Sequence, residues 1–132
     1  MLVIHGPNMN LLGIKNIDQE SNLTLDKINS NLRASVRNKN VKLSILQSHS
    51  ESKVVSFLHK KRKRIDHIII SPEIWNKNGY LIKETLSILK IPLSILVTSS
   101  YKTSIFNQNI NCAKIVEHDS YLDGYLKILK SL

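Results

Sequence analysis

Residues 3–13 read VIHGPNMNLLG, an apolar run that passes directly into a segment with Gly, Pro and two Asn. Ile and Val favour strands whereas Gly, Pro and Asn favour turns, so the stretch predicts a buried strand that ends in a shaped loop. We expect this strand over Leu2 to His5. Four further runs rich in Ile, Val and Leu predict strands of the same kind: Val41 to Gln47, His67 to Ile70, Ile91 to Val97 and Ala113 to Val116.

Segments of helical period separate these runs. Leu25, Ile28, Leu32 and Val36 recur at helical spacing behind Thr24, a typical N-cap residue. Further helices are expected to contain residues 54–58, 81–89 and 121–129. The alternation predicts an α/β fold, a doubly wound five-stranded parallel sheet with strand order 2-1-3-4-5. At 132 residues, the chain fits a single domain over residues 1–132.

This topology predicts where a ligand would bind. In a doubly wound sheet the site lies outside the carboxyl ends of the strands where the strand order reverses, here between the first and third strands. The loops GPNMN (residues 6–10), SPEIWNKNG (71–79) and TSSYK (98–102) should therefore lie together, and IKNIDQES (14–21) is expected to fold over them as a lid.

The net charge of +9 raises the question of nucleic-acid binding. Most of the basic residues are Lys spread along the chain, and only HKKRKR (59–64) is dense. That run falls where a helix should end, and cations there complement the helix dipole and face water. A solvated helix end is favoured over a nucleic-acid patch, and anion binding through Lys60 to Arg64 stays open.

The apolar stretches, the first residues and the cysteine content of the chain bear on its localisation. Its longest apolar stretches are far shorter than the roughly 20 residues that span a bilayer, so no membrane association is expected, and no signal peptide precedes the first strand. Cys112 is the only cysteine, which excludes an intramolecular disulfide and a multi-cysteine metal site. A single cysteine suits a reducing compartment, and we expect a cytoplasmic protein.

The opening stretch resembles the type II 3-dehydroquinate dehydratases, whose first strand ends in G-P-N-x-N-x-L-G. Weaker similarities follow in order along nearly the whole chain: LTLDKIN, QSHSE, IDHIIISP, IPLSILVTS and DGYLKILKSL. The resemblance implies a flavodoxin-like fold, trimers that stack into dodecamers, and no cofactor or metal. It also implies the dehydration of 3-dehydroquinate to 3-dehydroshikimate in the shikimate pathway.

This reaction needs a base, an enolate stabiliser and an acid. By the resemblance, Asn8 matches the Asn that holds the enolate-stabilising water. The family's lid Tyr, which is the base, corresponds to Glu20, and the Arg that makes it acidic corresponds to Lys15. Lys15 keeps the charge but lacks the planar guanidinium. Glu20 is either a desolvated new base or, as is commoner for Glu, a solvated surface carboxylate.

The family's acid is the largest departure. The His that protonates the leaving hydroxyl corresponds to Val97, and the Glu that orients it corresponds to Ile95; neither can transfer a proton. The resemblance also implies ligand-contacting positions at Ser71, Lys77, Ser99, Ser100 and Ser104, and a position at Glu84 that reaches a neighbouring subunit. Ser99 and Ser100 match the carboxylate-binding loop, and ordinary loop serines would look the same.

Other residues are candidates to replace the missing catalytic groups. His5 ends the first strand and His49 follows the second, so either could approach the expected site, although a histidine at a strand end is more often structural. Trp75 and Tyr80 could stack on a ligand, or cover the core or a subunit contact. Cys112 is expected to be small buried filler beside the fifth strand.

Three hypotheses follow. The first is a divergent dehydroquinase homologue with weak or lost turnover that keeps a pocket for a small carboxylate and assembles as a homo-oligomer. The second is an active dehydratase that uses Glu20 with Lys15 or Lys77 in new roles. The third is a non-catalytic protein that binds nucleic acid or an acidic partner through Lys60 to Arg64.

Overall fold

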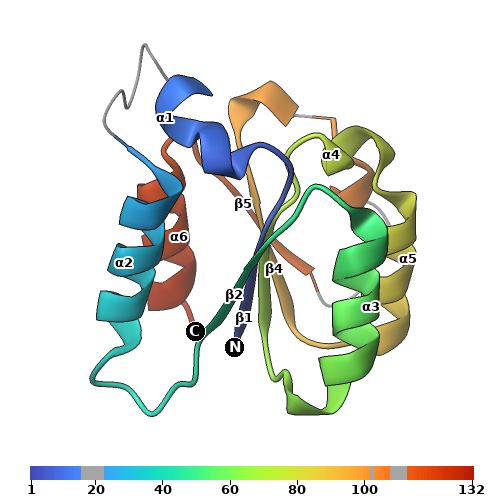
Figure 1. Ribbon diagram of the computed structural model, residues 1–132, viewed down its shortest axis with the longest axis horizontal. Helices are drawn as coiled ribbons and strands as arrows, with labels where there is room; N and C mark the ends of the chain where they lie inside the picture. Colours follow the sequence, from blue (N-terminus) through green and yellow to red (C-terminus); the bar gives the residue numbers. More distant parts are fainter. Residues whose placement is uncertain (16–22, 102, 108–112) are drawn as a thin grey trace.

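The computed structural model describes residues 1–15, 23–101, 103–107 and 113–132. Five parallel strands form one sheet in the order β2-β1-β3-β4-β5, which confirms the predicted topology (Figure 1). The strands are β1 (Leu2–His5), β2 (Ser44–Gln47), β3 (Ile68–Ser71), β4 (Leu93–Val97) and β5 (Ala113–Glu117).

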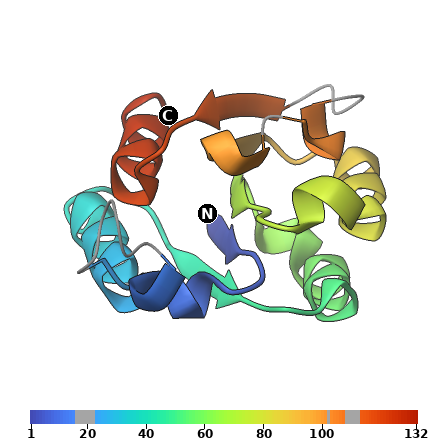
Figure 2. The same ribbon diagram turned by 90° about the horizontal axis from the view of Figure 1, so that it is seen from above.

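Two layers of helices cover the sheet. On one face α2 (Leu25–Val36) packs beside α6 (Tyr121–Lys130), and on the other α3 (Glu51–Lys61) packs beside α5 (Tyr80–Leu89) (Figures 1 and 2). All four were predicted. The predicted N-cap of α2 is also confirmed, because the Thr24 hydroxyl accepts the Lys27 N–H at 3.3 Å. No helix in the described part of the chain has the length and apolarity needed to cross a membrane.

Short helical turns were not predicted. They are α1 (Leu12–Lys15), α4 (Trp75–Asn78) and the 3-10 turns η1 (Met9–Leu11), η2 (Arg62–Arg64), η3 (Ser99–Tyr101) and η4 (Ile105–Asn107). One turn of helix is too short to produce a readable period in the sequence. Five of these six turns lie in the loops that follow β1, β3 and β4, so they shape the carboxyl edge of the sheet.

The core has two apolar layers because the central strands are buried on both faces. In β1, Leu2 and Ile4 point toward α3 and α5, whereas Val3 points toward α2 and α6. The predicted β2 and β4 began too early. Val41 is exposed and lies before the edge strand. Pro92 has no N–H to give to the ladder, and β4 begins directly after it.

Gly6 brings two of the predicted site loops into contact. Its N–H donates to the Ser71 carbonyl at 2.9 Å. A Cβ at this position would lie 2.6 Å from the Pro72 oxygen and 2.7 Å from that of Ser71, closer than carbon and backbone oxygen approach. The absence of a side chain therefore lets the loop after β1 lie directly on the loop after β3.

Candidate functional site

The carboxyl ends of β1, β3 and β4 point to the same edge of the sheet, as expected for parallel strands. Figure 2 looks onto this edge, where η1 and α1, α4, and η3 surround the strand ends. The lid segment falls mainly within residues 16–22, which lie outside the described residues, as does Glu20. Lys15 ends α1.

Asn8 occupies a left-handed backbone conformation with φ of 69° and is exposed at this edge. Asn tolerates this conformation better than most residues, which suits a tight loop. The Asn8 N–H donates to Nδ1 of His49 at 3.3 Å, so His49, which follows β2, lies beside the Asn8 loop. Both side chains are exposed at this end of the switch point.

His5 forms a buried chain of hydrogen bonds beneath the same edge. Its Nε2 lies 2.8 Å from Oδ1 of Asn29, and its Nδ1 lies 2.8 Å from the Tyr125 hydroxyl, which also bonds the Ser71 hydroxyl. An amide oxygen only accepts, so Nε2 carries the proton and Nδ1 accepts from Tyr125. Ser71 must then donate to the Tyr125 oxygen, and its proton is directed into the protein.

Burial keeps the hydrogen-bonded side chains of His5 and Tyr125 uncharged. Desolvation lowers the pKa of His5 to about 4, although the hydrogen bond to Asn29 opposes the shift. Desolvation also raises the pKa of Tyr125. At neutral pH His5 carries no charge, and both its nitrogens are already engaged. Its geometry fits a structural histidine that joins β1, α2 and α6.

Glu73 is a buried carboxylate that sequence reasoning missed. It follows Pro72, has φ of 54°, and is only 3% exposed. Its Oε2 accepts from the Tyr121 hydroxyl at 2.9 Å, and Nδ2 of Asn76 donates to its carbonyl at 2.8 Å. Burial, and then the charge of Glu73, raise the pKa of Tyr121, so the phenol keeps its proton. No local sequence pattern predicts the pairing of Glu73 with Tyr121, because the two residues are 48 positions apart.

The end of β4 offers hydrocarbon where the family resemblance places the proton donor. Ile95 is fully buried and Val97 is 2% exposed, and both belong to the apolar layer on the α3 and α5 face. Beyond them, Ser99 and Ser100 are exposed. The Ser99 N–H donates to Oδ1 of Asp119 at 3.3 Å, so a side chain of this protein already accepts that backbone donor.

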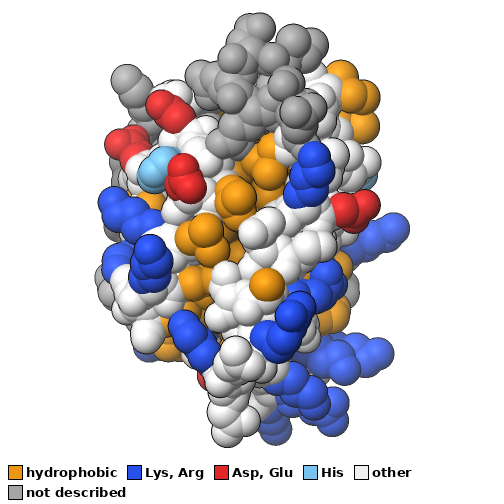
Figure 3. All heavy atoms as spheres, turned by 90° about the vertical axis from the view of Figure 1, so that its left-hand side faces the viewer, with side chains coloured by type: hydrophobic (Ala, Val, Ile, Leu, Met, Phe, Trp, Pro, Cys, Tyr) orange, Lys and Arg blue, Asp and Glu red, His pale blue; other side chains and the backbone are white. Residues whose placement is uncertain are grey.

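The surroundings of Ser99 are acidic. An open hollow there is lined by Ser99, Glu117, His118 and Asp119. Figure 3, which faces α2 and α6, shows acidic side chains on both sides of a histidine at the upper left of this face. Two carboxylates in the lining repel an anion at short range, and they oppose the predicted carboxylate contact.

The remaining predicted residues are spread over several surroundings. Lys77 is exposed on α4, and Glu84 is exposed on α5. Ser104 is buried and hydrogen-bonded to Oδ1 of Asn76 at 2.5 Å. Trp75 is 3% exposed and packs in the core, which agrees with the alternative that it covers the core, whereas Tyr80 is 62% exposed.

The fold thus brings the loops of Asn8, Ser71 and Ser99 to one edge, as predicted, and directs Ser71 and Ser104 inward. Ligand contact by Asn8, Lys15, Glu20, Ser71, Lys77, Glu84, Ser99 and Ser100 remains a prediction. Within the described ranges no three His, Cys, Asp or Glu side chains are grouped so that they could hold a metal ion. Cys112 lies outside the described residues.

The strand order and the gathered loops define a flavodoxin-like α/β protein with its candidate site at the topological switch point. Residues 1–119 match the family model described as dehydroquinase class II, so the chain belongs to that family. The family match confirms the resemblance seen in the opening motif.

Individual relatives agree with this assignment. A 3-dehydroquinate dehydratase of Pectobacterium atrosepticum is 31% identical over 122 residues, which cover 92% of this chain and 75% of that protein. One from Clostridium botulinum strain 657 is 30% identical over 103 residues, 77% of this chain and 70% of that protein. The crystal structure of type II dehydroquinase from Butyrivibrio crossotus superposes with a TM-score of 0.82 at 20% identity, covering 98% of this chain and 94% of that one. That superposition supports the fold.

Proposed function

We propose that this dehydroquinase homologue has weak or no dehydratase activity. The observation that carries the proposal is the hydrocarbon at the end of β4, where Ile95 and Val97 are buried in the core. A buried aliphatic side chain cannot protonate a leaving hydroxyl, and His5, which is buried beneath the same edge, is held neutral by its surroundings. The test is an assay of 3-dehydroquinate turnover.

The alternative of an active enzyme rests on Glu20 as base with Lys15 or Lys77 as a cationic partner. Lys77 is exposed on a helical turn at the candidate edge, a position that supports such a role. A third reading, a non-catalytic binding or assembly protein, is supported by the positive charge outside this edge. We favour the first proposal. The active-enzyme alternative identifies no proton donor for the leaving hydroxyl, and the binding-protein alternative does not use the dehydration chemistry of the family.

We further propose that the edge retains weak binding of a small carboxylate such as 3-dehydroquinate, in competition with Asp119. Asp119 accepts the Ser99 N–H that a ligand carboxylate would need. Replacing it with Asn removes a negative charge from the hollow and weakens its hold on this donor. Isothermal titration of Asp119→Asn is expected to show about tenfold tighter binding of 3-dehydroquinate.

Asp26→Asn, which removes an exposed carboxylate from α2, serves as the control for this titration. It should bind 3-dehydroquinate as the unmodified protein does. Equal affinity of Asp119→Asn and the unmodified protein would contradict the competition between Asp119 and a ligand.

We propose a homo-oligomer, a trimer or a dodecamer by family resemblance, in the cytoplasm. Two exposed apolar side chains on α5 support this proposal. Leu81 and Ile88 are 46% and 69% exposed, and they lie on the helix face that also bears Glu84.

Sedimentation velocity should show that Ile88→Glu dissociates the assembly toward monomer, because the substitution places a charge in an apolar contact. Lys53→Glu on exposed α3 surface should leave the assembly unchanged, and an unchanged Ile88→Glu assembly would move the interface elsewhere.

A further inference from the structure

A basic hollow lies at the amino edge of the sheet, the edge opposite the candidate site. It encloses about 630 Å³, a size typical of small-molecule pockets. The first residues of β1 and β2 with the residues before them, the second half of α3, and residues 63–66 form it. Its lining is Met1, Leu2, Asn40, Val41, Lys42, Ser44, Phe57, Lys61, Lys63, Arg64, Ile65 and Asp66. We call it the amino-edge hollow.

The hollow combines cationic and apolar groups. Four cationic side chains line it, from Lys42, Lys61, Lys63 and Arg64. Within the part of the chain that the structure describes, none of these four side chains has a carboxylate within ion-pair distance. The apolar groups include the half-buried ring of Phe57, which packs against the core.

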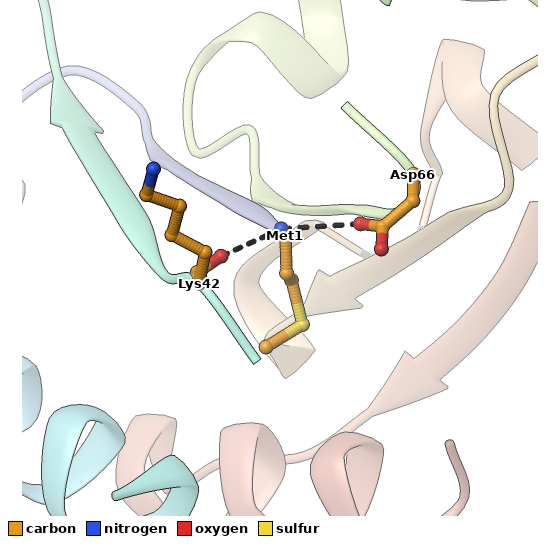
Figure 4. A network of polar contacts seen from close by, with 3 residues as sticks. All are labelled: Met1, Lys42 and Asp66. Atoms are coloured by element: carbon orange, nitrogen blue, oxygen red, sulfur yellow. Dashed lines mark hydrogen bonds and ion pairs between the residues drawn. The ribbon is translucent and has the colours of Figure 1, made fainter. Parts of the chain in front are cut away.

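The only carboxylate in the lining does not offset this charge. Asp66 is 85% exposed and pairs at 3.1 Å with the Met1 amino group, which also donates to the Lys42 carbonyl at 2.8 Å (Figure 4). In that view the Lys42 side chain extends away from Asp66. Four like charges around one concave surface repel one another, and a bound multivalent anion would relieve that repulsion.

We propose that the amino-edge hollow binds a small molecule that carries a di- or triphosphate group. The guanidinium of Arg64 matches two phosphate oxygens at once, and the three lysines supply point charges for the others. The apolar lining, with Phe57, receives the organic part of the ligand. The hollow favours a small molecule over nucleic acid, because Lys60 and Arg62 of the same basic run lie outside its lining.

The chain offers a matched pair of variants. Lys61→Gln with Lys63→Gln removes two charges from the lining, whereas Lys53→Gln with Lys60→Gln removes two charges from α3 at positions outside the lining. Isothermal titration at low ionic strength with inorganic pyrophosphate and with ATP is expected to show saturable binding. The lining variant should weaken it about tenfold and the control less than about twofold, since direct charge contacts outweigh distant ones.

Three outcomes would overturn the proposal. One is the absence of saturable binding of pyrophosphate and ATP at concentrations up to about 1 mM. A second is equal weakening in both variants, which would indicate diffuse charge. The third is binding of single-stranded DNA without binding of either small phosphate. Lys63→Gln alone changes one exposed residue, and it provides the same comparison against Lys60→Gln if the double variant fails to fold.

Discussion

Purified protein mixed with 3-dehydroquinate is expected to form the conjugated enone product at least about 10⁴-fold more slowly than the Pectobacterium atrosepticum relative under the same conditions. General acid and base groups are each worth roughly two to four powers of ten in rate, and their losses are not additive. By the family resemblance, this chain has Val97 in place of the acid and Glu20 in place of the activated base. Asn8, which by the same resemblance matches the water-holding Asn, has an amide side chain that cannot act as a general acid.

The rate is followed by the absorbance of the enone, with the relative assayed at equal protein concentration. Turnover within about tenfold of the relative would contradict the proposal, because it would require a proton donor that the proposal excludes. In that case Glu20→Gln separates the two enzymatic readings. Loss of the rate in Glu20→Gln, with Asp26→Asn unaffected, would support Glu20 as a new base.

Unfolding at decreasing pH is expected to show a second large effect, a loss of about 3 kcal/mol of stability attributable to His5 between pH 6.5 and pH 4. The folded protein lowers the pKa of His5 from 6.5 to about 4, so the unfolded chain takes up a proton first as pH falls. The stabilisation is therefore complete above pH 6.5 and is lost as the pH approaches the folded value. The physical cause is the burial of the imidazole between Asn29 and Tyr125.

Urea denaturation at a series of pH values from 7 to 4 measures this loss. His5→Gln removes the titrating group, so its free energy of unfolding should fall less steeply over that interval, whatever its stability at pH 7. His59→Gln replaces an exposed histidine on α3 and should retain the full slope. Identical slopes for the unmodified protein and His5→Gln would show that the imidazole is not held neutral by the fold.

The positions of the candidate-site loops were largely predictable from the sequence, whereas the hydrogen-bond partners of their side chains were not. VIHGPNMNLLG placed Asn8 at the carboxyl end of the first strand, and the parallel topology placed the Ser71 and Ser99 loops beside it. Neither the sequence motif nor the topology showed that Ser71 donates inward to Tyr125, or that Asp119 accepts the Ser99 N–H. These contacts join segments 54 and 20 residues apart, and no local pattern encodes them.

The sequence by itself determined the strands, the four long helices and their order in the fold. Short continuous apolar runs between helical segments are typical of parallel strands covered on both faces, and the period of Leu25, Ile28, Leu32 and Val36 fits one helix face. Only the tertiary structure decided which polar groups share the interior, including the pairing of Glu73 with Tyr121 and of His5 with Tyr125. A buried polar group must find its partner wherever the folded chain brings one, and sequence distance does not limit that choice.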